Sequence, residues 1–119
     1  MNEFALLYDY CMSRKGAEET FPFDDVTLVF KVKGKMFAIL PTDSTSTVIA
    51  LKCDPERAIE LREQYEAITA GYHLNKKHWN SVEVDGRLSL KLVYELIDHS
   101  YDLVVKSLKK AQQAALQAL

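Results

Sequence analysis

The residues best suited to chemistry lie close together in residues 68–86, which contain two histidines, two lysines, two asparagines and the only tryptophan. Imidazole nitrogens are common metal ligands. His73 and His78 are five positions apart, however, which places them on opposite faces of a strand. No cysteine lies near them in sequence, and Glu83 and Asp85 complete no familiar ligand spacing. We therefore expect neither a metal nor another cofactor.

Nucleophilic catalysis would require a base that faces a serine or a cysteine. His99 directly precedes Ser100, but adjacent helical residues point about 100° apart, so these two side chains would not face each other. Lys52 beside Cys53 could lower the pKa of that thiol. The alternative for each residue is a structural role. We expect a protein that is not an enzyme, with an uncharacterised enzymatic activity as a third alternative.

Basic residues gather in one part of the chain, although the net charge is −2 and the pI is about 5.9. Residues 26–91, without the helix expected at 54–66, contain 8 basic and 3 acidic residues, whereas the rest contains 7 basic and 14 acidic residues. The candidates for nucleic-acid contact are Lys31, Lys33, Lys35, Lys52, Lys76 and Lys77. Such lysines could bind phosphates while Trp79, His78 or Asn75 contact bases. Alternatively, they only prevent edge-to-edge association of sheets.

The first half of the chain predicts one helix and three strands. Apolar residues repeat at helical spacing from Phe4 to Cys11, with Asn2 suited to the N-cap and Gly16 to the end of the helix. Two strands follow in residues 26–40 around a tight turn at Lys33 and Gly34, and residues 47–52 form a third. Pro22 limits any strand before them to a short or edge position.

The second half predicts two helices and one or two strands. Asp54 and Pro55 are typical of a helix start. The segment 78–84 alternates like a strand, and Ser89 caps a long helix. The tail, residues 110–119, favours helix and could fray.

These elements predict a single α+β domain over residues 1–119, in the order α-β-β-β-α-β-(β)-α. The connections between the first three strands are too short for parallel crossovers, so the sheet should be antiparallel. Helices packed on one face would complete a two-layer sandwich. The chain contains no apolar run of about 20 residues, so we expect no membrane span.

Four blocks of the sequence resemble, in order, successive blocks of the MmcQ/YjbR family: KVKGKMFAIL, LKCDPERAIELR, YHLNKKHWNSVEVDG and LIDHSYDLVVKSL. The resemblance extends over residues 3–110. It implies a CyaY/frataxin-like fold and DNA binding through two hairpins, an arrangement called a double wing. It does not imply the iron handling of frataxin, because the first helix offers only Glu3 and Asp9 and is followed by Arg14 and Lys15.

The family signature falls on His73, Asn75, Lys76, His78 and Trp79, and the earlier blocks add Lys35 and Lys52. Two interpretations remain open. These residues could form one binding surface, or they could be a folding device in which Asn75 holds a turn and Trp79 seals the sheet against a helix.

The sequence as a whole predicts a small cytosolic binding module that contacts double-stranded DNA through basic hairpins. The alternative is a protein–protein adaptor that uses the region of Trp79 and exposed strand edges. We expect a monomer or weak dimer. Cys11 and Cys53 lack a CxxC arrangement and are expected to be free thiols in a reducing compartment.

Overall fold

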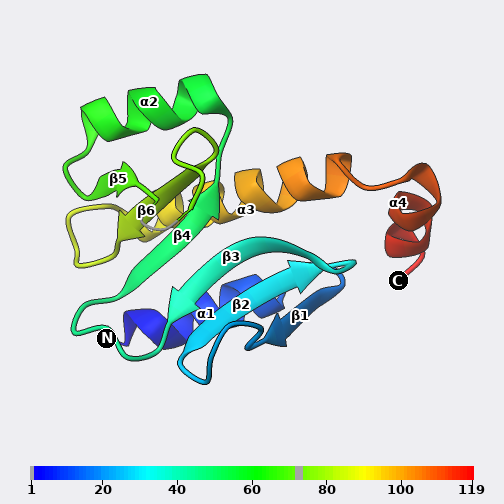
Figure 1. Cartoon of the computed structure of the whole chain (residues 1–119). Helices are drawn as coiled ribbons and strands as arrows, with labels where there is room; N and C mark the ends of the chain where they lie inside the picture. Colours follow the sequence, from blue (N-terminus) through cyan, green and yellow to red (C-terminus); the bar gives the residue numbers. More distant parts are fainter. Residues whose placement is uncertain (1, 72–73) are drawn as a thin grey trace.

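The computed structural model describes residues 2–71 and 74–119 (Figure 1). These residues form four helices and six strands. Their order is α1 (Glu3–Met12), β1 (Ala17–Thr20), β2 (Thr27–Val32), β3 (Lys35–Pro41), β4 (Val48–Lys52), α2 (Pro55–Gln64), β5 (Ile68–Ala70), β6 (Trp79–Glu83), α3 (Leu90–Lys106) and α4 (Lys110–Gln117).

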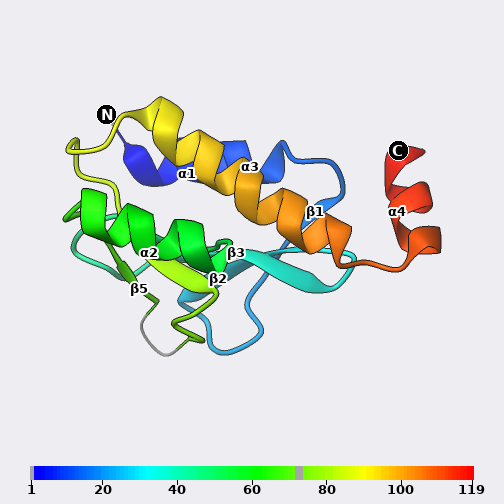
Figure 2. The ribbon, with the colours of Figure 1, turned by 90° about the horizontal axis from the view of Figure 1, so that it is seen from above.

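The six strands form one antiparallel sheet in the order β1-β2-β3-β4-β6-β5. Helices α1, α2 and α3 lie together on one side of it (Figure 2). The predicted two-layer α+β fold is confirmed. The strand before Pro22 is β1, which is short and lies at an edge, as expected.

Hydrophobic residues are buried on both faces of the sheet. The larger cluster fills the space between the sheet and the helices, and its largest fully buried side chains include Phe30, Phe37 and Leu7. A second cluster, Val29, Ile39, Ala50 and Trp79, lies on the opposite face. No helix of the described residues covers that face, which we call the helix-free face.

The local start and turn signals are confirmed. The side chains of Asn2, Asp54 and Ser89 accept hydrogen bonds from backbone N–H groups three residues on, at 3.2, 3.2 and 3.1 Å. Lys33 and Gly34 have φ angles of 50° and 81°, the left-handed pair that a two-residue hairpin turn requires.

The end of the first helix differs from the prediction. The first helix ends at Met12, and Gly16 lies beyond it with a φ of 73°. The long helix ends at Lys106, where the Ser107 hydroxyl donates to the carbonyl of Val104 at 2.6 Å. Such a local side-chain bond competes with continuation of the helix. The chain then turns and forms α4 as a separate helix.

Candidate nucleic-acid interface

The strand order places two basic connections at the same end of the sheet. The β2–β3 turn follows the last residue of β2, and β4 runs in the same direction as β2 because each is antiparallel to β3. The last residue of β4, Lys52, pairs with the first residue of β6, Trp79. The connection between β5 and β6 therefore projects from the end that also carries the β2–β3 turn.

All six candidate lysines lie near this end, and five of them lie in the two connections or face the helix-free side. Lys33 is exposed in the turn, and Lys76 and Lys77 are exposed in the β5–β6 connection. Lys31 pairs with Met36, which packs against the second cluster, and Lys52 pairs with Trp79, which belongs to it. Because paired residues share a face of the sheet, both lysines face the helix-free side. We call Lys31, Lys33, Lys52, Lys76 and Lys77 the lysine end.

Lys35 points to the other side of the sheet. It pairs with Val32, whose side chain is buried among the helices. Its Nζ lies 3.4 Å from both the carbonyl oxygen and the hydroxyl of Ser107. A cation at this position interacts favourably with the negative end of α3. Lys35 thus stabilises the helix layer and does not extend the lysine end.

Asn75 organises the β5–β6 connection through hydrogen bonds. Its side-chain oxygen accepts from the N–H of Lys77 at 3.0 Å, which forms an Asx turn. Its carbonyl accepts from the N–H groups of His78 and Trp79, at 3.1 and 2.9 Å. The turn-holding role considered for Asn75 is confirmed. His73, another signature residue, lies outside the described residues.

Arg62 of α2 ties this connection to the helix layer, and sequence reasoning did not single it out. Its guanidinium donates to the carbonyl of Lys76 at 3.3 Å and to the side-chain oxygen of Asn80 at 2.7 Å. Asn80 is only 2% exposed and also donates to the carbonyl of Ala58. The connection that carries Lys76 and Lys77 is therefore anchored at its base.

Trp79 is buried on the helix-free face, with 8% of its surface exposed. It packs with Val29, Ile39 and Ala50, and Leu74 packs against the same cluster. Of the two interpretations left open, the one in which Trp79 seals the sheet against a helix is therefore wrong for this residue. A ring buried in this way is not presented for stacking on a base. The cluster that contains it packs against Leu74 and so connects the sheet to the β5–β6 connection.

Comparisons with known proteins agree with this architecture. The YjbR family model matches residues 12–103. The chain belongs to the YjbR family. It is 34% identical to the Escherichia coli (strain K12) protein YjbR over 113 residues, 95% of this chain and 96% of that protein. It is 38% identical to YbdF of Escherichia coli O157:H7 over 96 residues, 81% of this chain and 79% of YbdF.

Two solved structures of similar proteins share the fold. Deinococcus radiodurans protein DR2400 superposes with a TM-score of 0.88 at 44% identity, over 93% of this chain and 85% of that chain. A Pseudomonas syringae protein superposes with a TM-score of 0.73 at 29% identity, over 87% of this chain and 98% of that chain. The names of these relatives state no ligand or reaction.

Ser100, in the last block of the YjbR resemblance, bridges two strands. Its fully buried hydroxyl accepts from the N–H of Lys52 at 2.9 Å and donates to the carbonyl of Phe37 at 2.5 Å. The β3–β4 pairing ends at Ala38 and Leu51, so the serine replaces the next bonds of the ladder. Both hydrogen bonds of the hydroxyl are to backbone groups, which indicates a structural role for Ser100.

His99 and the two cysteines also have structural surroundings. Nε2 of His99 accepts from the N–H of Asp54 at 3.2 Å, and burial lowers the pKa of His99 below its usual value. Cys11 and Cys53 are buried free thiols, as expected. Burial raises the pKa of Cys11 to about 12 and raises that of Cys53. The suggestion that Lys52 activates Cys53 is therefore wrong, since a reactive cysteine needs a lowered pKa.

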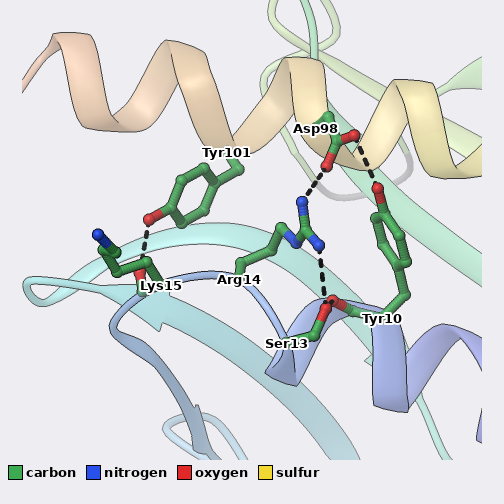
Figure 3. A network of polar contacts seen from close by, with 6 residues as sticks. All are labelled: Tyr10, Ser13, Arg14, Lys15, Asp98 and Tyr101. Carbon is green, nitrogen blue, oxygen red and sulfur yellow. Dashed lines mark hydrogen bonds and ion pairs between the residues drawn. The ribbon is translucent and has the colours of Figure 1, made fainter. Parts of the chain in front are cut away.

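A second polar cluster joins α1 to α3 (Figure 3). Asp98 accepts from Arg14 at 2.9 Å and from the hydroxyl of Tyr10 at 2.7 Å. The Arg14 guanidinium lies 4.3 Å above the ring of Tyr10, whose other neighbour is the stacked ring of Tyr94. The Tyr101 hydroxyl donates to the carbonyl of Lys15. These contacts engage Arg14 on the helix side of the sheet.

Within residues 2–71 and 74–119, no group of three or more histidine, cysteine, aspartate or glutamate side chains is arranged to hold a metal ion. Over the same residues, no helix is long and apolar enough to span a membrane.

Proposed function

We propose that this YjbR-family protein binds double-stranded DNA through the lysine end. The observation that carries the proposal is the placement of two exposed basic connections, the β2–β3 turn and the β5–β6 connection, at one end of the sheet. Lys31 and Lys52 add positive charge on the helix-free face between them. Lysines arranged along this end of the sheet can contact successive phosphates.

The binding is expected to be independent of DNA sequence. Lysine contacts to phosphates position a protein but carry no base information. Trp79, which pairs with Lys52, is buried. Glu18 pairs across from Lys31 and the net charge is −2, so the affinity should be modest.

The salt dependence can be estimated from the lysine end. If four of the five lysines contact phosphates, the slope of log K against log salt is about −3.6, so binding weakens about 150-fold between about 50 and 200 mM salt. Lys33→Glu with Lys76→Glu removes two of these contacts. The slope should then fall to about −1.8, a weakening of only about 12-fold over the same range.

Fluorescence anisotropy with a labelled duplex would test this proposal. The double variant should bind much more weakly than the wild type at low salt, for every duplex sequence. Lys91→Glu with Lys110→Glu makes the same change in net charge at exposed positions on α3 and α4, and should bind nearly as the wild type does. Equal losses in both double variants, or no wild-type binding at low salt, would contradict the proposal.

A protein–protein adaptor is the second candidate. Phe21 and Phe23, in the loop between β1 and β2, are 45% and 62% exposed, beside the edge strand β1. Exposed aromatic side chains are enriched in protein interfaces. A protein partner bound there should remain bound at salt concentrations that release DNA. For either function we propose a cytosolic monomer or weak dimer. The two free thiols support a reducing compartment.

A further inference from the structure

A groove crosses the helix-free face, from the β1–β2 and β3–β4 loops at the end of the strands opposite the lysine end to Leu74 of the β5–β6 connection. It encloses about 540 Å³, which lies within the range of small-molecule sites. Ile39, Val48 and Ala50 lie along it. The β1–β2 loop contributes Phe23 and Asp24, and Leu74 reaches it from the β5–β6 connection.

The lining is mostly apolar and carries a single charged side chain. Besides the residues above, the groove is lined by Pro41 and by the hydroxyl-bearing residues Thr27, Ser44 and Ser81. The carboxylate of Asp24 is the one charge among the described lining residues. No basic side chain of the described part of the chain belongs to the lining.

Asp24 is held as an anion that still has room for a ligand. Its Oδ1 accepts from the N–H groups of Val26 and Thr27, at 3.0 and 2.7 Å, and its Oδ2 accepts from the Thr27 hydroxyl at 3.0 Å. These bonds lower the pKa of Asp24. A carboxylate offers about four acceptor sites, so one acceptor site remains after these three bonds.

The exposed Phe23 adds a second preference for positive charge. Phe23 is 62% exposed and comes directly before Asp24 in the lining of the groove. Aromatic faces attract ammonium groups, and the attraction adds to that of a neighbouring carboxylate. If the amine group of a ligand lay between these two side chains, the apolar part of the ligand would lie over Ile39 and Ala50.

The groove suits a small molecule better than an extended peptide. It crosses β2, β3, β4 and β6, which are interior strands of the sheet. Their backbone groups hydrogen-bond to one another, so the floor cannot pair with a peptide backbone as a free sheet edge does. Burying an unpaired peptide group is costly, whereas a small ligand with one amine needs only one charged partner.

We propose that this groove binds a small amphipathic cation, an amine with an aromatic or aliphatic body, with Asp24 as the partner of the amine. The charged part of this site, Asp24, lies in the β1–β2 loop at the end of the strands opposite the lysine end, and the proposal does not depend on DNA binding.

A set of three probes with the same ring would test the ligand class. Phenethylamine, 2-phenylethanol and 3-phenylpropionate differ in charge, as a cation, a neutral molecule and an anion. Titrations followed by NMR should shift the methyl resonances of Ile39, Val48, Ala50 and Leu74 with the amine. The amine should bind about fivefold more tightly than the alcohol, the factor expected for one solvent-exposed charge pair, and the anion more weakly still.

Two variants test the role of charge in the groove. Asp24→Asn should reduce the preference for the amine over the alcohol to less than about twofold, since the charge pair is lost. Ser44→Lys places a cation at an exposed part of the lining and should weaken amine binding without affecting the core. Gln64→Lys, an exposed position on α2, makes the same charge change outside the groove and serves as the matched control.

Three results would overturn the proposal. The first is the absence of shifts at the groove methyl groups with any probe. The second is binding of the alcohol as tight as that of the amine. The third is an equal effect of Ser44→Lys and Gln64→Lys, which would show that only the net charge matters. Ser44→Lys keeps the test valid even if Asp24→Asn disturbs the β1–β2 loop.

Discussion

Removing the Ser100 hydroxyl should destabilise the junction of β3 and β4 strongly. In Ser100→Ala, the N–H of Lys52 and the carbonyl of Phe37 both lose the group that binds them now. Direct pairing cannot replace it, because the β3–β4 ladder has already ended at Leu51. Each unsatisfied buried backbone group costs about 1–3 kcal/mol, so for the two groups we expect a loss of about 2–6 kcal/mol in the free energy of unfolding.

Urea denaturation would measure this loss, with emission of Trp79 and far-UV circular dichroism as two probes. The expected loss is a large part of the stability of a small domain, about 5–15 kcal/mol. The midpoint should fall while the slope m stays unchanged, since the same surface is exposed on unfolding. Ser100→Cys should recover part of the loss, because a thiol is a weak donor and acceptor.

Ser107→Ala is the matched control. Its hydroxyl also donates to a backbone carbonyl, that of Val104, but at an exposed helix end where water can replace it. We expect a change within about 0.5 kcal/mol there. A loss below about 1 kcal/mol in Ser100→Ala, similar to that of Ser107→Ala, would refute the reasoning. The gap between β3 and β4 would then not depend on Ser100.

Two further predictions concern the helix layer. In Gly16→Ala, the new methyl group would meet Leu116 of α4 at a backbone φ of 73°, so we expect a loss of about 1–3 kcal/mol and faster hydrogen exchange in α4. His99 has a lowered pKa and accepts from Asp54 as the neutral imidazole, so its stabilisation is present above the unfolded pKa of about 6.5 and is lost as the pH falls below it. Urea midpoints at neutral and mildly acidic pH should therefore differ more in the wild type than in His99→Gln, and equal differences would contradict this assignment.

The features predicted correctly from the sequence are those set by neighbouring residues. Asn2, Asp54 and Ser89 cap helices because a short polar side chain reaches the backbone three residues on. Lys33 and Gly34 form the hairpin turn because that turn needs two residues with positive φ. Such signals act over a few bonds and depend little on the rest of the fold.

The features missed depend on contacts between distant segments. Arg62 and Asn80 are 18 residues apart, and only the packing of α2 on the sheet brings them together. The face of Lys35 depends on its pairing with Val32 across a two-residue turn, since paired residues share a face. Lys31 lies one residue before Val32 and therefore faces the opposite side. The alternation of side chains along each strand alone could not show that Lys31 and Lys35 lie on opposite faces of the sheet.

The two ends of the helix-free face differ in charge. Hairpin connections of an antiparallel sheet alternate between its two ends, and here the basic and acidic side chains lie in connections at different ends. The β2–β3 and β5–β6 connections carry Lys33, Lys76 and Lys77 at one end. The β1–β2 and β3–β4 loops carry Asp24 and Asp43 at the other. A phosphate backbone and a small cation are thus attracted to different ends of one face. Charge reversal at the lysine end should leave amine binding in the groove nearly unchanged, because several strand residues and the intervening solvent separate the two ends and salt screens charges beyond about 8–10 Å.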